Sequence, residues 1–400
     1  GYGLTWIEQA GITTPFTTPL FPFIQTLGQQ SLDNLTPAFV LSAGPTVTVQ
    51  PVNADSGLGQ GVFGVQRTNG SGYAQQWNFT LQKTFGANWS VEAGYLGSKL
   101  TRLGVPDVNL NQLTVEQLAL GAALTQPVAN PYFGQIPANT SLGTATIARG
   151  QLLRPYPRFT TVALYRNNVG HSTYHSFQAR LEKRYSRGLT FTAAYTFSRL
   201  IDDAGAVFDA AVLTGPVANF QAADSFNKRL EKDVSTGHVP HIFAAGFVYE
   251  LPFRGWQIAG IARAQSGSPI AVTQATNLNA FAGFGIQRPN RLMEPALPGD
   301  QRSTSRWFNT AAFSAAPQFT IGNASRNPVT GPGYQTLDLM LGKTFRLTER
   351  ARLEFRAECF NTLNTPPLGN PNGGFGNAAF GTITTALDPR VAELMVKLMF

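Results

Sequence analysis

Charged residues are scarce in this sequence, at 13% of its 400 residues. Soluble domains carry about 25%, and a hydrophobic fraction of 43% does not rise to compensate. The sequence also lacks any run of about 18 apolar residues, which excludes a transmembrane helix. If the chain enters a membrane, it must therefore cross it as β-strands.

The sequence is also poor in cysteine, and it does not start with a secretory leader. Cys359 is the single cysteine, which excludes an intrachain disulfide framework, and its neighbours favour a small hydrophobe on the apolar face of a strand. The sequence starts at Gly1 without a basic, apolar leader. Because an exported barrel needs such a leader, we expect the chain to be part of a longer protein.

Clustered positive charge is missing as well, although the formal net charge is +8. The basic residues are scattered along the chain, so the sequence does not predict a nucleic-acid partner. Scattered arginines on the wet face of a strand are more typical of a barrel lumen or of contact with lipopolysaccharide.

The last ten residues alternate between apolar and polar side chains. One side of this ribbon comprises Ala392, Leu394, Val396, Leu398 and Phe400, and the other comprises Glu393, Met395 and Lys397. A period of two predicts a strand with one apolar and one wet face. An outer-membrane barrel demands this pattern, because its strands face lipid on one side and a polar interior on the other.

Four predicted hairpins upstream repeat this alternation, and each hairpin has a short turn between its two strands. They are expected within residues 73–95, 175–198, 241–256 and 336–359. Long polar segments separate them, at residues 99–172, 200–238 and 267–332. We expect residues 1–72 to form an irregular surface segment. In the first long segment, Thr114 and Gln117 predict a capping box for one helix that runs to about Leu124, with Leu113 and Leu118 as a hydrophobic staple.

The four predicted hairpins and the final strand together give about nine spanning strands. Short turns alternate with long loops between them. The sequence therefore predicts an all-β, transmembrane, antiparallel up-and-down β-barrel with long extracellular loops. With Phe400 at the periplasmic end, residues 1–72 fall outside the cell as a loop segment and residues 73–400 form the barrel part. An odd strand number that starts outside indicates a portion of a larger barrel.

Charged residues at period two predict the lumen-lining positions. These candidates are Arg180, Glu182, Arg184, Asp338, Arg352, Glu354, Arg356 and Glu358. Such charges suit a wet interior in which acid and base pair across neighbouring strands. They would contact substrate directly, or form a pairing ladder that holds the barrel or contacts a plug.

Several segments resemble one family, the Oar-like branch of the TonB-dependent outer-membrane receptors. The likeness covers most of residues 73–400 and is carried by the order and spacing of segments 174–184, 188–198, 331–334, 345–350, 355–361 and 380–400.

That resemblance implies a plugged 22-stranded barrel, of which this chain is the carboxy-terminal portion. It also implies coupling to the inner-membrane protein TonB through an amino-terminal region outside this chain. In such receptors the terminal strand is the signal for the barrel assembly machinery, here Val396, Leu398 and Phe400. The ligand does not follow from the strands, and no cofactor is implied.

Other candidate sites have weaker support in the sequence. His171 with His175 and His238 with His241 have helical metal-ligand spacings but fall at predicted strand starts, which favours interfacial or loop roles. Asp202, Asp203 and Asp224 suit calcium or, more simply, solvated loop carboxylates. No catalytic Ser, His and acid arrangement stands out, and Gly283-Phe284-Gly285 lacks the context of a nucleotide site. Interface girdles are predicted at Tyr73, Trp77, Trp89, Tyr95, Tyr195, Tyr249 and Trp256.

The leading hypothesis is a receptor that captures a ligand with its extracellular loops and imports it with energy from TonB. A passive porin-like channel is the first alternative. A surface adhesion or morphology protein anchored by its barrel is the second, and an enzyme is the least supported.

Overall fold

The structure is a computed structural model of residues 1–400. It describes residues 1–7, 35–44, 55–64, 70–105, 107–164, 167–204, 222–253 and 255–400, with residues 29, 31, 53 and 66. Most of the predicted irregular segment, residues 1–72, lies outside the described residues. No helix among the described residues is long and apolar enough to cross a membrane.

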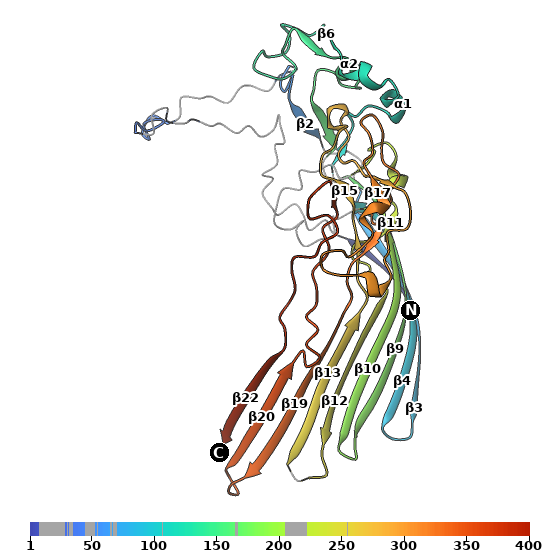
Figure 1. The fold of residues 1–400 in the computed structure, drawn as a ribbon, viewed down its shortest axis with the longest axis vertical. Helices are drawn as coiled ribbons and strands as arrows, with labels where there is room; N and C mark the ends of the chain where they lie inside the picture. The colour runs from blue at the N-terminus through green and yellow to red at the C-terminus, as the bar shows by residue number, and fades with distance from the viewer. Residues whose placement is uncertain are drawn as a thin grey trace.

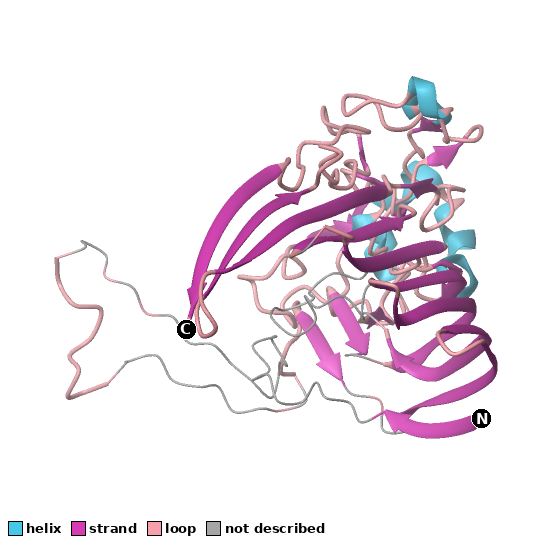
Figure 2. Cartoon of the chain, turned by 90° about the horizontal axis from the view of Figure 1, so that it is seen from below, coloured by secondary structure: helices cyan, strands magenta, loops and turns pink. Residues whose placement is uncertain are grey.

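One large antiparallel sheet dominates the molecule (Figure 1). In spatial order its strands are β1 (Tyr2–Ile7), β3 (Gly72–Phe85), β4 (Trp89–Gly104), β9 (Asn168–Ser186), β10 (Leu189–Asp202), β12 (His241–Glu250), β13 (Trp256–Gln265), β19 (Tyr334–Arg346), β20 (Arg352–Phe360) and β22 (Val391–Met399). Each of these ten strands pairs with the next of the ten along the chain, and Figure 2 shows the sheet curving into an arc. Its edges are β1 and β22.

The nine strands predicted from residue 73 onward correspond to β3 through β22 of this sheet. Strand β1 was not predicted, so the description of the amino-terminal segment as irregular was wrong for residues 2–7, and it was also wrong for residues 61–64, which form a short strand. Only three apolar side chains alternate there, at Tyr2, Leu4 and Trp6, which is too short a pattern to stand out. The strand forms by pairing with β3, with Tyr2 opposite Trp77 and Ile7 opposite Gly72.

Tight turns join the strands at one end of the sheet. Between β9 and β10 the turn is Arg187-Gly188, with φ of 52° and 78°. Positive φ at both positions is the type I′ conformation that matches the twist of two paired strands. A side chain at Gly188 would lie 2.7 Å from the carbonyl oxygen of Glu250, so glycine is also required by space.

Long connections pack together at the opposite end (Figure 1). Their short strands are β2 (Gly61–Gly64), β5 (Val108–Asn109), β6 (Pro127–Ala129), β7 (Thr146–Ala148), β8 (Thr161–Leu164), β11 (Asp233–Val234), β14 (Pro269–Ile270), β15 (Thr273–Gln274), β16 (Asn290–Arg291), β17 (Phe313–Ser314), β18 (Val329–Thr330) and β21 (Gly374–Phe375). Their helical turns are α1 (Val115–Leu118), η1 (Gly121–Thr125), α2 (Arg149–Leu152), η4 (Lys228–Glu231), η5 (Ala280–Ala282), η6 (Gly299–Gln301) and η7 (Thr310–Ala312). The buried hydrophobic clusters lie in these connections, as around Phe308 and Leu113.

The predicted helix is present but short. Its capping box is confirmed: the Thr114 hydroxyl accepts from the Gln117 amide at 3.2 Å, and the Gln117 side chain accepts from the Thr114 amide at 2.8 Å. Leu113 and Leu118 are both buried in one cluster. The α-helix ends at Leu118, well before Leu124, because Gly121 takes a φ of 57° and a 3₁₀ turn follows.

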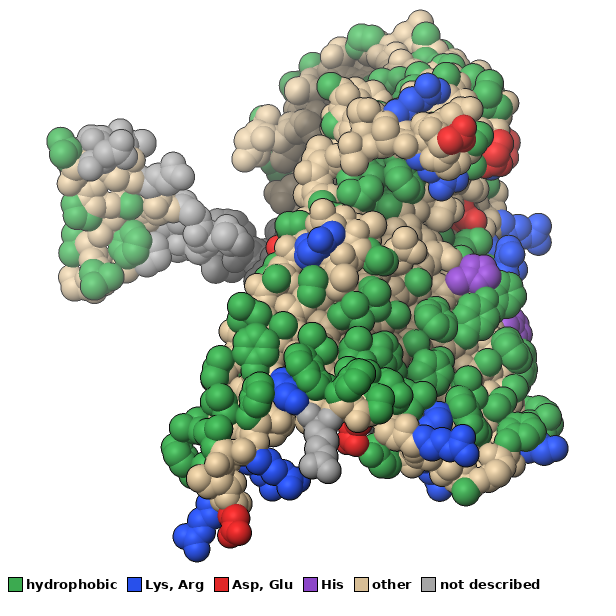
Figure 3. All heavy atoms as spheres, turned by 60° about the horizontal axis from the view of Figure 1, so that its bottom comes forward, with side chains coloured by type: hydrophobic (Ala, Val, Ile, Leu, Met, Phe, Trp, Pro, Cys, Tyr) green, Lys and Arg blue, Asp and Glu red, His purple; other side chains and the backbone are tan. Residues whose placement is uncertain are grey.

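The two faces of the sheet differ in chemistry. The register aligns Leu341, Ala357 and Leu394 on one side, which we call the apolar face. Every carboxylate of the main strands falls on the other side, the polar face: Glu92, Glu182, Asp202, Glu250, Asp338, Glu354, Glu358 and Glu393. Hydrophobic side chains cover the strands in Figure 3, and Lys and Arg gather near the turn end. The predicted alternation therefore extends across the whole sheet.

Candidate functional site

The candidate lumen residues divide between distant strands. Arg180 and Glu182 lie on the polar face of β9, whereas Arg352, Glu354, Arg356 and Glu358 lie on that of β20. Four strands separate β9 from β20. The set is therefore a distributed polar lining rather than one cluster, and its role as a lumen remains a prediction.

Ion pairs on this face run along strands. Arg180 Nη2 lies 3.2 Å from Glu182 Oε2, and Arg356 Nε lies 2.5 Å from Glu354 Oε1. The expectation that acid and base would pair across neighbouring strands was wrong for both pairs. On β20 the cause is the register, which places Gly342 and Met395 opposite Arg356, so the nearest carboxylate is two residues back on the same strand.

Asp338 and Arg184 have local structural roles. The carboxylate of Asp338 accepts from the Asn361 amide at 2.8 Å, which caps the bend that follows β20. The Arg184 amide donates to the Asn88 carbonyl at 2.8 Å, next to two hairpin turns. Neither contact requires a ligand.

A cavity of about 500 Å³ lies among the long connections. We call it the loop cavity, and its lining comes from the β4–β9, β10–β12 and β13–β19 connections. Its charged lining residues include Asp203, Asp224, Lys228, Glu231, Arg288 and Arg326. Val105, Val108, Val169 and Ile286 supply apolar surface.

Buried ion pairs bind the connections to one another around this cavity. Arg288 Nη2 lies 2.5 Å from Glu231 Oε2, and these side chains are only 3% and 11% exposed. Arg326 Nη2 lies 2.6 Å from Asp202 Oδ1, on the polar face at the end of β10. Lys228 Nζ lies 3.3 Å from Asp203 Oδ2. The pairs of Arg288 and Arg326 neutralise charges that would be costly to bury alone, whereas Lys228 is 33% exposed.

Some polar atoms of the cavity residues have unused hydrogen-bonding capacity. Among the described residues, Arg326 Nε and Nη1, Arg288 Nε, Ser225 Oγ and Asn327 Oδ1 are buried and have no partner. Leaving a buried donor unpaired costs about 1 to 3 kcal/mol.

The cavity carboxylates are already engaged. Asp224 Oδ1 accepts from Gln112 Nε2 at 2.7 Å and from the Phe226 amide at 2.9 Å. Asp202 and Asp203 pair with basic side chains instead of converging on one point. In the described part of the chain, no group of three or more His, Cys, Asp or Glu could hold a metal ion.

The four histidines take separate partners. The His171 amide donates to Asp203 at 2.6 Å, while His175 and His241 each contact a tyrosine hydroxyl through Nδ1 at 2.7 Å. His238 Nδ1 accepts from the Leu200 amide at 3.3 Å. Burial, together with Arg199 and His241, lowers the pKa of His238 and keeps its imidazole neutral.

Sequence reasoning missed Arg288 and Arg326, which line the loop cavity and form its buried ion pairs. Both lie in a Pro-rich segment without a local motif, and Arg326 meets Asp202 from 124 residues away. No short-range signal could have paired them. Another buried arginine of the connections, Arg154, donates to the Thr160 carbonyl at 2.6 Å, and burial lowers its pKa to about 10.

Solved structures resemble this chain over most of its length. The outer membrane transporter YddB from Escherichia coli is 12% identical, with 86% of this chain and 34% of that chain covered and a TM-score of 0.42. The pyoverdine outer membrane receptor FpvA from Pseudomonas aeruginosa is 12% identical, with 84% and 31% covered and a TM-score of 0.40. The FrpB iron transporter from Neisseria meningitidis is 11% identical, with 85% and 33% covered and a TM-score of 0.37. The chain thus spans about a third of each protein.

A family assignment comes from the sequence itself. Among curated proteins, none matches the chain. The family model described as "Outer membrane beta barrel domain" matches residues 1–393. This match agrees with the antiparallel sheet and its apolar face, and it locates the protein in the outer membrane of Gram-negative bacteria. The chain belongs to the outer membrane β-barrel domain family.

Proposed function

We propose that this chain is the carboxy-terminal barrel portion of a TonB-dependent receptor of the Oar-like branch. Strand β1 and residues 73–400 supply barrel strands and extracellular loops, and the rest of residues 1–72 supplies a further loop segment. The polar face lines the route of an imported ligand. The family match, the alternation of tight turns with long connections and the motifs of residues 174–198 and 331–361 support this proposal.

One observation carries the transport proposal: a cavity lined by charged and polar side chains lies at the end of the polar face. Asp202 occupies a polar-face position on β10 and holds Arg326, which lines the cavity. A ligand bound in the loop cavity would therefore lie next to the polar face of the sheet. A protein that used its loops only for adhesion would have no need for this continuity.

The chemistry of the loop cavity favours a small, uncharged ligand with several acceptor oxygens. Asn167, Thr236 and Lys228 bring side-chain donors to the lining, while Glu231 and Asp202 already balance the charges of Arg288 and Arg326. An anion would therefore gain hydrogen bonds without much net attraction. Val105, Val169 and Ile286 suit apolar parts of the same molecule. A short, end-blocked peptide has this combination.

Medium depletion in cells that express the full-length protein tests this function. Wild-type cells should consume at least one compound that cells lacking the gene, or cells with inactive TonB, leave in the medium. Arg326→Gln should slow its consumption, whereas Arg302→Gln, which changes a loop arginine outside the cavity lining, should not.

Two outcomes would contradict the proposal. Consumption that requires the gene but not TonB would identify a passive channel. Normal consumption without the gene, together with lost adhesion, would identify an anchor for adhesive loops.

A further inference from the structure

Three arginines among the described residues are buried, and one of them lacks a carboxylate partner. Arg288 pairs with Glu231, and Arg326 pairs with Asp202. Arg154 is 7% exposed, yet no carboxylate in the described part of the chain forms an ion pair with it. A buried charge without a counter-charge is costly. The position of Arg154 therefore indicates that a counter-charge comes from outside the chain.

Backbone carbonyls hold the Arg154 side chain in place. Its Nη1 donates to the Thr160 carbonyl at 2.6 Å, and its Nη2 donates to the Phe281 carbonyl. These bonds join the β4–β9 connection to the β13–β19 connection. Carbonyl oxygens do not neutralise the charge, and each Nη carries one further hydrogen for another acceptor. Burial lowers the pKa of Arg154 only to about 10, so the guanidinium stays charged at neutral pH.

Arg154 lines a pocket of about 540 Å³, which we call the arginine pocket. This volume lies within the range of about 300 to 1,000 Å³ that is usual for small-molecule sites. The arginine pocket shares Gly285 with the loop cavity and otherwise has its own lining. Among its described lining residues there is no carboxylate and no second cation. The pocket thus combines one positive charge with neutral walls.

Amide side chains fix the walls of the arginine pocket. Asn109 Nδ2 donates to the Gly283 carbonyl at 2.8 Å, and Asn277 Nδ2 donates to the Phe284 carbonyl at 2.8 Å. Gln151 Nε2 donates to two backbone carbonyls, at 2.9 and 2.8 Å. Walls held in this way are formed before a ligand binds, which lowers the entropic cost of binding.

Hydroxyl groups of the lining remain available. Ser141, Thr160 and Thr161 line the pocket, and none of them is buried. Their hydroxyls have no hydrogen-bond partner in the described part of the chain. A hydroxyl can both donate and accept, so these three suit a ligand that itself carries hydroxyl groups.

The charge of the pocket favours one carboxylate over a phosphate. Arg154 is the single ionised group among the described lining residues, so a monoanion brings the net charge to zero. A phosphate monoester carries about −1.5 to −2 at neutral pH and would leave negative charge without a partner. Hydrogen bonds between a guanidinium and a carboxylate are also stronger than those between neutral groups.

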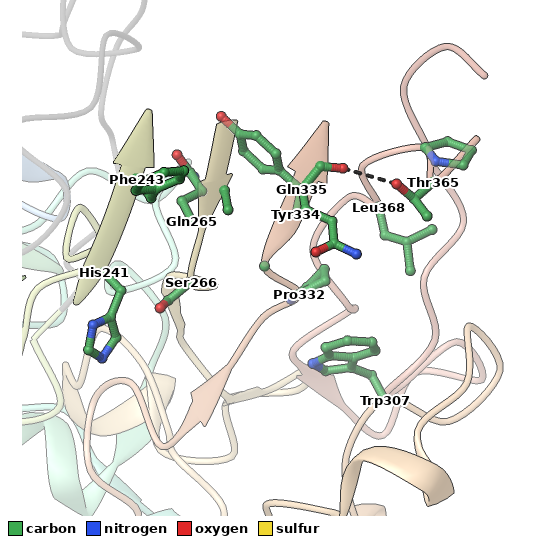
Figure 4. A pocket seen from close by; sticks show the side chains of 13 residues that line it. His241, Phe243, Gln265, Ser266, Trp307, Pro332, Tyr334, Gln335, Thr365 and Leu368 are labelled. Atoms are coloured by element: carbon green, nitrogen blue, oxygen red, sulfur yellow. Dashed lines mark hydrogen bonds between the residues drawn. The ribbon is translucent and has the colours of Figure 1, made fainter. Parts of the chain in front are cut away.

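A second groove, at the strand ends, lacks these features. It measures about 560 Å³, and Figure 4 shows His241 and Trp307 at its two sides. The Trp307 indole is already engaged, because it donates to the Thr330 carbonyl at 2.9 Å. The described lining of this groove contains no arginine, lysine or carboxylate. It therefore has no fixed charge that would select an acid.

We propose that the arginine pocket binds a sugar acid, with its carboxylate on the Arg154 guanidinium and its hydroxyl groups on Ser141, Thr160 and Thr161. The ligand supplies the counter-charge that the chain does not. This site goes beyond the proposed function, because it requires neither import nor coupling to TonB. An end-blocked peptide, which suits the loop cavity, carries no charge for Arg154.

Calorimetric binding to the purified full-length protein in detergent tests this site. D-Glucuronate should bind about 10- to 100-fold more tightly than D-glucose, which has a hydroxymethyl group in place of the carboxylate. This factor is expected for hydrogen bonds to a charged group. Arg154→Gln should abolish the preference. Arg158→Gln changes an exposed arginine of the same connection, outside the pocket lining, and should bind like the wild type.

Two further variants separate binding from folding. Arg154→Lys keeps the positive charge and should retain a preference for glucuronate over glucose. Thr161→Val removes one available hydroxyl and should weaken glucuronate binding about 3- to 10-fold, as expected for one neutral hydrogen bond. Heat-modifiable mobility shows whether each variant is folded.

Three results would overturn the proposal. They are equal affinity of the wild type for glucuronate and glucose, an equal loss in Arg154→Gln and Arg158→Gln, and displacement of glucuronate by inorganic phosphate or acetate at similar concentrations, which would indicate a small-anion site. Normal glucuronate binding with failed ligand uptake would refute the proposed function alone. Uptake that depends on TonB, without any binding of glucuronate, would refute this site alone.

Discussion

Arg326 Nη2 lies 2.6 Å from Asp202 Oδ1 and thereby joins the β13–β19 connection to the end of β10. Both side chains are at least nine-tenths buried. Asp202→Ala would leave the guanidinium charge buried without its partner. We expect local opening around residues 322–330 to become easier by about 3 to 5 kcal/mol, measured by native-state hydrogen exchange.

A double-mutant cycle provides the control for this ion pair. Asp202→Ala combined with Arg326→Leu removes both charges and should recover most of the loss. Arg180→Ala removes one partner of the exposed Arg180–Glu182 pair and should change stability by less than about 1 kcal/mol. An equally small effect of Asp202→Ala would show that the pair does not hold the connection.

A charge on the apolar face should destabilise the barrel. Leu339 lies on that face opposite Cys359, and Met340 lies on the polar face opposite Glu358. Leu339→Arg should lower the unfolding free energy by about 2 to 4 kcal/mol near the midplane, whereas Met340→Arg should cost much less. Denaturant unfolding in lipid vesicles measures both. If Met340→Arg were the more harmful change, the two faces would be reversed.

The carboxy-terminal residue should matter for assembly. Phe400 follows β22 and is 93% exposed, so its removal loses little packing within the chain. We propose that Val396, Leu398 and Phe400 are read by the barrel assembly machinery. Deleting Phe400 from the full-length protein should therefore reduce its outer-membrane level and its heat-modifiable form, while Phe400→Tyr should be tolerated. Normal levels after the deletion would contradict this role.

Acid should loosen the connection that follows β10. The neutral His238 imidazole accepts from the Leu200 amide, and its pKa is lowered mainly by burial. Because the unfolded segment binds the proton more readily, this stability is complete above pH 6.5 or so and is lost as the pH falls through the folded pKa.

Hydrogen exchange of residues 199–204, corrected for intrinsic rates, measures this pH effect. Exchange should accelerate between pH 7.5 and pH 5 in the wild type and become independent of pH in His238→Gln. His171→Gln serves as the control, because it changes an exposed histidine of the same region and should keep the wild-type response. Unchanged exchange in the wild type at pH 5 would contradict the role of His238.

The strands were predictable from sequence because their pattern is local. Leu353, Phe355 and Ala357 alternate with charged residues inside one segment, and the register of β20 reproduces that alternation. Strand β1 was missed because six residues carry too little of the same pattern, and its partner β3 lies more than 60 residues away.

The loop cavity was not predictable, because its contacts are long-range. Arg288 reaches Glu231 over 57 residues, and Arg326 reaches Asp202 over 124. Nothing near either arginine in sequence distinguishes it from a solvated loop residue. The helix that begins after Thr114 was predicted only in part. Its capping box is a local pattern and was predicted, whereas its early end at Leu118, before the positive φ of Gly121, was not.

Labelling of two adjacent residues tests most directly whether the polar face is a wet lumen wall. In a Cys359→Ser background, Glu354→Cys and Phe355→Cys place one thiol on each face of β20. A water-soluble maleimide added to the full-length protein in outer-membrane vesicles should label residue 354 and leave residue 355 protected by lipid. Labelling of residue 355 with protection of residue 354 would contradict the transport account.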